Sequence, residues 1–152
     1  MKEHILETQM EIPLKLVEVF PFFCDIENLE RITPPELHFE IITPRPIEIT
    51  LGAVVDYRLQ LYVIPFRWQS EITVWRPPHE FVDEQIHGPY KLWMHRHLFY
   101  EENGNTIIED KVRYQLPLWP LGEVAHPLVR LQLKHIFEYR QRATRDALLG
   151  KR

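Results

Sequence analysis

The chain has 152 residues and a mass of 18.4 kDa, with 45% hydrophobic and 26% charged residues. This mixture is typical of a folded globule and excludes a disordered tail, and the length suffices for one core without disulfides. We therefore expect a single domain over residues 1–152. The net charge is −4, with acidic and basic residues interspersed, so we expect no nucleic-acid partner.

Cellular location is indicated by the cysteine content and by the absence of long apolar runs. The one cysteine, Cys24, cannot form an internal disulfide, which favours a reducing compartment. No apolar run approaches the roughly 20 residues that cross a membrane, and the charged N-terminal residues lack the apolar stretch of a signal peptide. We expect a soluble, cytoplasmic protein without a transmembrane segment.

The first thirty residues predict one strand followed by two short helices. Residues 4–12 alternate in polarity as an extended segment, which Pro13 ends because proline cannot donate to a ladder. Leu14 to Arg31 then carries apolar residues at helical spacing, interrupted near Pro21 and again near Asp25. These interruptions favour two short helices over one long helix.

The middle of the chain has a period of two. Junctions such as Ile64–Pro65 and Gly88–Pro89 carry turn residues, and Asn103–Gly104 is the strongest short hairpin signal. Six short strands at about ten-residue spacing predict a continuous antiparallel sheet. The expected strands cover 37–44, 53–63, 67–76, 81–87, 91–101 and 106–116.

The end of the chain predicts a long amphipathic helix. After Pro117 and Pro120, apolar residues recur every three or four positions from Ala125 to Ala147. One helix is then available to cover one face of a seven-stranded sheet. A curved sheet around a single helix closes poorly, so we expect a pocket between them, bounded by the two short helices.

Three segments carry a family resemblance. They read L-Q-L-Y-V-I-P-F-R-W at 59–68, F-V-D-E-Q-I-H-G-P-Y-K-L-W-M-H-R-H-L-F at 81–99 and D-K-V-R-Y-Q-L-P at 110–117. Together with the element order, they resemble the Bet v 1-like, START-related (SRPBCC) superfamily and its bacterial polyketide-cyclase-like ligand-binding proteins. The resemblance implies an α+β helix-grip fold, in which a seven-stranded curved antiparallel sheet wraps around a long C-terminal helix. It supports carriers, receptors and cyclases alike, so fold does not choose among activities.

Hairpin geometry predicts which strand residues face one another. A two-residue turn at Asn103–Gly104 places His97 opposite Asp110. A three-residue loop at 88–90 places Asp83 opposite His95 and Gln85 opposite Trp93. A four-residue loop at 77–80 places Ile72 beside Gln85 and Val74 beside Asp83, although a one-residue slip would turn Asp83 and Gln85 outward.

The concave face is therefore expected to carry histidines and carboxylates among aromatic rings, roofed by the last helix. An unpaired buried polar group costs about 1–3 kcal/mol, so such groups either satisfy one another or line a wet pocket. The residues predicted to bind a ligand are Tyr57, Leu59, Trp68, Asp83, Gln85, Trp93, His95, His97, Phe99, Asp110, Tyr114, Leu128, Gln132, Ile136 and Arg140.

Several interpretations stay open for this polar set. The first is a structural network of His97–Asp110 and His95–Asp83 pairs. The second is a cavity for a small hydrophobic or amphipathic ligand, oriented by the polar groups. The third is a cyclase- or dehydratase-like enzyme with His97 or His95 as general base and Asp110 as orienter, and the fourth is an interaction protein with a vestigial cavity.

A metal or cofactor is not expected. His95-x-His97 with Asp110 superficially matches two histidines and one carboxylate, but His97 cannot easily bind a metal while pairing across the ladder. Because Asp–His pairing favours the imidazolium form, we also expect stability to fall as pH rises through a raised histidine pKa.

Overall fold

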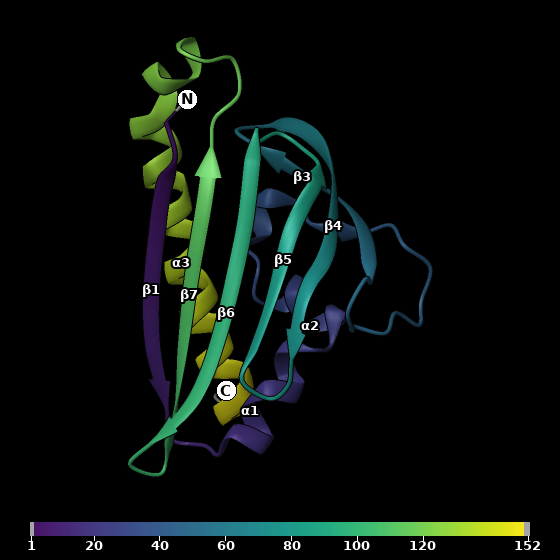
Figure 1. The fold of residues 1–152 in the computed structure, drawn as a ribbon, viewed down its shortest axis with the longest axis vertical. Helices are drawn as coiled ribbons and strands as arrows, with labels where there is room; N and C mark the ends of the chain where they lie inside the picture. Colours follow the sequence, from purple (N-terminus) through teal and green to yellow (C-terminus); the bar gives the residue numbers. More distant parts are fainter. Residues whose placement is uncertain (1, 151–152) are drawn as a thin grey trace.

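The computed structural model describes residues 2–150 and contains a sheet, two short helices and one long helix. The seven strands follow the order β1-β7-β6-β5-β4-β3-β2, with antiparallel pairing throughout. In Figure 1, α3 runs along one face of the sheet, from the end where the chain begins to the end where α1 lies. The elements are β1 (His4–Ile12), α1 (Leu16–Phe23), α2 (Ile26–Arg31), η1 (Pro35–Leu37), β2 (Glu40–Ile41), β3 (Val54–Leu61), β4 (Ile64–Arg76), β5 (Glu80–His87), β6 (Leu92–Glu102), β7 (Asn105–Gln115), η2 (Leu121–Ala125) and α3 (His126–Leu149).

The predicted helix-grip architecture is confirmed, including the two short helices between β1 and β2. α2 begins at Asp25, whose side chain accepts a hydrogen bond from the Glu27 backbone, a standard N-cap that explains the break predicted there. α3 ends at Gly150 in the left-handed conformation that glycine adopts readily. None of the helices in residues 2–150 combines the length and apolar character needed to span a bilayer.

Two predictions about the early strands are wrong. The strand predicted over 37–44 is only Glu40–Ile41, because η1 and the left-handed His38 precede it. The turn predicted at Ile64–Pro65 lies instead at Tyr62–Val63, and Leu61 pairs with Ile64. Both Tyr62 and Val63 have positive φ, which turn chemistry at the sequence level does not predict for such residues.

The predicted register holds for two hairpins and fails for the third. His97 faces Asp110 and Asp83 faces His95, as the Asn103–Gly104 and 88–90 turns predict. On β4, however, Ile72 pairs with Asp83 rather than with Gln85, and Val74 pairs with Val82 rather than with Asp83. Two causes combine here. Arg76 pairs with Glu80, so the turn has three residues (77–79) rather than the predicted four, and the ladder shifts by one further residue between Ile72 and Val74, which counting from the turn cannot detect.

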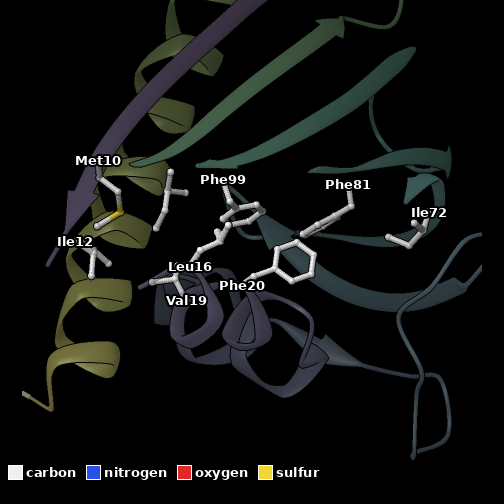
Figure 2. Close-up of a cluster of buried hydrophobic side chains, with 9 residues drawn as sticks. Met10, Ile12, Leu16, Val19, Phe20, Ile72, Phe81 and Phe99 are labelled. Atoms are coloured by element: carbon white, nitrogen blue, oxygen red, sulfur yellow. The ribbon is translucent and has the colours of Figure 1, made fainter. Parts of the chain in front are cut away.

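The lower part of the concave face is filled by hydrocarbon. α1 packs Phe20 edge-on against Phe99, with ring centroids 5.1 Å apart, and Phe81 lies next to them (Figure 2). Phe99 is among the most buried side chains of the described residues. The full cluster consists of Met10, Ile12, Leu16, Val19, Phe20, Ile72, Phe81, Phe99 and Ile108. This packing attaches α1 to the sheet and fills one end of the concave face, so the remaining space lies farther along the sheet, under α3.

Candidate functional site

A cavity of about 190 Å³ lies between the concave face of the sheet, α2 and α3. Its wall is mostly apolar: Leu59 and Trp68 come from the sheet, and Leu133 and Phe137 come from the roof helix. Alternation along β3, β4 and β6 aims every second side chain into this space. The cavity is thus the product of a curved sheet that one helix covers incompletely.

The structure places nine of the predicted binding residues on the cavity wall. They come from four strands and from α3, and the inward alternation predicted for the sheet accounts for most of them. They are Tyr57, Leu59, Trp68, Asp83, Trp93, His95, His97, Ile136 and Arg140.

The predicted residues near the lower and outer parts of the sheet lie away from the wall. Phe99 belongs to the hydrophobic cluster beneath α1. Asp110 lies behind His95, to which it is hydrogen-bonded. Gln85 accepts from the Tyr90 backbone N–H at 3.1 Å and donates to the Tyr90 carbonyl at 2.7 Å, so it shapes the β5–β6 loop.

Three further predicted residues lie around α3 without reaching the cavity. The Tyr114 hydroxyl lies 3.0 Å from Nε2 of His126, at the start of α3. Leu128 is 59% exposed and Gln132 is half-buried, and neither belongs to the cavity wall, although both lie on the same i, i+4 row of α3 as Ile136 and Arg140. The predicted roof therefore lies on the correct helix and row, but it extends too far toward the start of α3, where the wall begins only at Leu133.

The polar groups on the wall form two hydrogen bonds that cross the ladder diagonally. His95 Nε2 lies 2.7 Å from Asp110 Oδ1, and His97 Nε2 lies 2.6 Å from Asp83 Oδ2. The predicted direct pairs, His97–Asp110 and His95–Asp83, are wrong: the nearest approaches of those pairs are 3.5 and 4.0 Å. The two imidazole rings stack with their centroids 3.7 Å apart. Each ring is therefore hydrogen-bonded to a carboxylate diagonally across the ladder rather than to the one directly opposite.

Burial decides the direction of the pKa shift for His97, whereas hydrogen bonds and nearby charges decide it for the two carboxylates. It lowers the pKa of His97 to about 4, more than the bond to Asp83 raises it, so His97 is neutral at pH 7. Burial alone would raise the pKa of Asp83, but the His97 hydrogen bond and the nearby charges lower it below its usual value. The pKa of Asp110 is lowered in the same way by its bond to His95 and by Arg140. The raised imidazolium pKa expected from Asp–His pairing is therefore wrong for His97.

Several wall residues were missed at the sequence level. Phe22, Phe23 and Leu29 reach the cavity from the short helices, and Phe39 reaches it from the segment before β2. The only clue in the sequence was the close spacing of Phe20, Phe22 and Phe23. Tyr90 also lies on the wall, held by the loop contacts of Gln85.

Two groups of side chains have donor atoms close enough for a metal ion. Asp83, His95 and His97 offer atoms within 4.8 Å of one another on the cavity wall. A metal there would have to replace the existing Asp83–His97 hydrogen bond. The second group joins His4, Glu123 and His126 at the other end of α3, where His4 is hydrogen-bonded to Glu123.

The arrangement of strands and helices matches several solved structures, although the sequences differ strongly. TTHA0849 from Thermus thermophilus aligns with a TM-score of 0.77 at 15% identity, covering 97% of this chain and 98% of that one. Ara h 8.0201 aligns with a TM-score of 0.68 at 15% identity, covering 99% and 100% of the two chains. A START superfamily protein from Mycobacterium smegmatis aligns with a TM-score of 0.67 at 13% identity, covering 97% and 98%.

Sequence comparison adds no assignment, because no protein-family model and no curated protein matches the chain. At these identities the structural likeness concerns the fold, and activity must be argued from the site. With its curved seven-stranded sheet around a long last helix, the chain shares the helix-grip fold of these solved structures, Ara h 8.0201 and the START superfamily protein among them.

Proposed function

We propose that the protein binds one small, mostly hydrophobic molecule with at least one polar group in the cavity. The observation that carries this proposal is the composition of the wall, where hydrocarbon surrounds one cluster of ionisable groups. Binding sites for small molecules commonly combine apolar walls with a few placed polar groups. The wall buries the apolar body, and the cluster orients the polar end.

The polar groups of the wall can serve both a donor and an acceptor on the ligand. The Asp83 carboxylate has a lowered pKa, so it is ionised at neutral pH and accepts a hydrogen bond. Arg140 has its guanidinium 5.7 Å from the Phe23 ring and 6.0 Å from the Phe137 ring. Within residues 2–150 it makes no hydrogen bond or ion pair, so its N–H groups are available to a carbonyl or hydroxyl oxygen.

Native mass spectrometry of the protein exposed to a mixed lipid and metabolite extract tests this proposal. We expect one retained mass, which organic extraction then releases for identification. Ala53→Leu fills part of the wall and should abolish retention, whereas Val54→Leu, at the next position and exposed, should not. No retained mass, or equal retention by both variants, would overturn the proposal.

Proton abstraction beside a carbonyl, as in a cyclase or dehydratase, is a second candidate. The observation in its favour is His97 Nδ1, which is buried and has no hydrogen-bond partner among the described residues. With Nε2–H donated to Asp83, this atom carries the lone pair that a general base needs. Time-resolved mass spectra of the retained molecule test it: loss of water with the native protein, and none with His97→Gln, would support catalysis.

A further inference from the structure

Large apolar side chains gather, exposed, at one end of the molecule. They come from the β3–β4 turn, the connection from β7 through η2, and the first turns of α3, which share the upper end of Figure 1. The Tyr62 hydroxyl donates to the Leu128 carbonyl at 2.8 Å and so joins two of these segments. This apolar end consists of Tyr62, Val63, Ile64, Leu118, Trp119, Leu121, Val124, Leu128 and Leu131, each between 49% and 86% exposed.

Two residues of the apolar end, Tyr62 and Val63, have backbone conformations that are unfavourable for their side chains. Tyr62 and Val63 have φ values of 50° and 64°, a region that disfavours β-branched residues in particular. The hairpin at the opposite end of the sheet uses Asn103 and Gly104 at the equivalent positions, the residues preferred in such turns. An exposed Val63 in place of glycine weakens the fold, and strain of this kind accompanies functional surfaces.

Cations without carboxylate partners surround the apolar end. Lys91 donates its backbone N–H to Gln115, just before the connection to η2. Lys2 and Arg130 lie close enough to His126, at the start of α3, to lower its pKa, although burial of His126 contributes more. These three basic side chains are exposed, and none forms an ion pair within the described part of the chain.

The carboxylates next to this end, Glu3 and Glu123, are both hydrogen-bonded to a basic side chain. Glu3 forms hydrogen bonds to Arg113 at 2.7 and 2.9 Å, and Glu123 binds His4 at 2.8 Å. Lys2, Lys91 and Arg130 therefore leave unpaired positive charge next to the apolar end, although the chain as a whole carries −4.

We propose that the apolar end docks on the surface of an anionic lipid bilayer. Apolar side chains enter the boundary between headgroups and acyl chains, while tryptophan and tyrosine favour the headgroup level. Free lysine and arginine side chains are attracted to anionic headgroups. If two copies of the chain met through their apolar ends, the unpaired cations of each copy would lie close together and repel one another. Charge therefore favours an anionic lipid surface over self-association.

Docking in this orientation also brings the bilayer next to the cavity. Leu61, which directly precedes Tyr62, lies on the cavity wall together with Leu133 of α3. The proposal stands without any cavity ligand, so its test uses vesicles alone and is independent of the proposed function.

Trp119 is a built-in probe for this contact. It is 49% exposed, whereas Trp68 and Trp93 are buried and Trp75 is half-buried. With vesicles of equal parts phosphatidylcholine and phosphatidylglycerol, we expect co-flotation, a blue shift of tryptophan emission and quenching by brominated acyl chains. Trp119→Phe should abolish the spectral change but leave flotation largely intact. Pure phosphatidylcholine or high salt should weaken binding, since salt screens exposed charges.

Paired variants assign the contact to the apolar end. Val63→Ser with Leu121→Ser should reduce partitioning at least tenfold, because two exposed side chains no longer enter the bilayer. Val17→Ser with Leu51→Ser is the matched control, since both residues are exposed apolar side chains elsewhere. Circular dichroism and thermal unfolding verify that each variant folds.

Three outcomes would overturn the proposal. The first is no binding to anionic vesicles at low salt, and the second is equal loss of binding in the apolar-end and control variants. The third is a concentration-dependent dimer, seen by light scattering without lipid, that Val63→Ser with Leu121→Ser removes. That dimer would assign the apolar end to a second copy of the chain.

Discussion

His97 on β6 is hydrogen-bonded to Asp83 on β5, although the residue that faces it across that ladder is Phe81. The imidazole stacks on the Phe81 ring at 4.1 Å and passes over it to the carboxylate. His95 likewise faces Val112 on the neighbouring strand β7 but is hydrogen-bonded to Asp110, two residues away on that strand. These two diagonal bonds tie three neighbouring strands together at the cavity wall.

Breaking one diagonal bond should destabilise the fold. His97→Phe keeps the stack on Phe81 but leaves the Asp83 carboxylate without its donor, and we expect a loss of about 2–4 kcal/mol. Adding Asp83→Leu should recover most of this loss, because no charge then remains unpaired. Urea unfolding at pH 7 measures both.

An exposed histidine–carboxylate pair of similar geometry provides the control for the His97→Phe variant. His135 Nε2 lies 2.6 Å from Glu36 Oε2, but both side chains are more than half exposed. His135→Phe should therefore leave the unfolding free energy nearly unchanged. If His97→Phe proved as mild as His135→Phe, the diagonal bonds would not hold the sheet.

Stability should decline on acidification below neutrality. The unfolded chain protonates His97 near its reference pKa of 6.5, whereas the folded protein does so only near 4, so the unfolded state binds more protons between these values. The resulting loss is on the order of 3 kcal/mol across that window. The lowered pKa values of Asp83 and Asp110 add a further loss as pH falls through their unfolded value of 3.8.

Urea midpoints at pH 7, 6, 5 and 4 measure this profile, and His97→Gln isolates the contribution of one imidazole. The difference in unfolding free energy between the native protein and His97→Gln should shrink as pH falls from 6.5 to 4. A native profile that rises on acidification over this range would contradict the burial-dominated pKa.

The β5–β6 loop should depend on one glutamine side chain. Gln85→Ala removes both hydrogen bonds to the Tyr90 backbone and should destabilise the protein by about 1–2 kcal/mol. A Cβ on Gly88 would clash with Gln85 Oε1, so Gly88→Ala should displace the same side chain.

A double-mutant cycle shows whether Gln85→Ala and Gly88→Ala destabilise the protein through the same Gln85 side chain or independently. In the Gln85→Ala background, Gly88→Ala meets no glutamine oxygen, so its additional effect on urea unfolding should nearly vanish. Additive losses would show that Gly88 acts by another route.

Removing the cavity guanidinium should shift the titration of both carboxylates. Arg140 contributes to the lowered pKa of Asp83 and of Asp110, so Arg140→Met should raise both pKa values. Methionine retains much of the packing over Phe23 and Phe137, and we expect the unfolding free energy to change by less than about 1 kcal/mol.

Carboxyl carbon NMR titrations measure these shifts directly. Arg142→Met serves as the control, because Arg142 is an exposed cation on the same helix. Equal shifts in the two variants would indicate a general charge effect rather than a local one.

Local chemistry was sufficient to predict most of the fold. Asn103–Gly104 accepts the positive φ values of a tight hairpin, so the β6–β7 register followed by counting. Prediction failed where the backbone departs from residue preference. The positive φ of Val63 moved a turn, and the β4–β5 pairing was displaced both by a three-residue turn before Glu80 and by the shift beside Ile72.

The candidate site divides in the same way. A period of two together with the Asn103–Gly104 hairpin dictates that His95, His97 and Asp110 point to one face of the sheet, and this is readable from the chain alone. Which carboxylate each imidazole reaches, and whether it meets the cavity or a neighbouring ring, depends on side-chain torsions and on the curvature of the sheet. Those quantities arise from packing between residues far apart in the chain, so tertiary structure alone placed Asp110 behind His95 and left His97 and Asp83 at the wall.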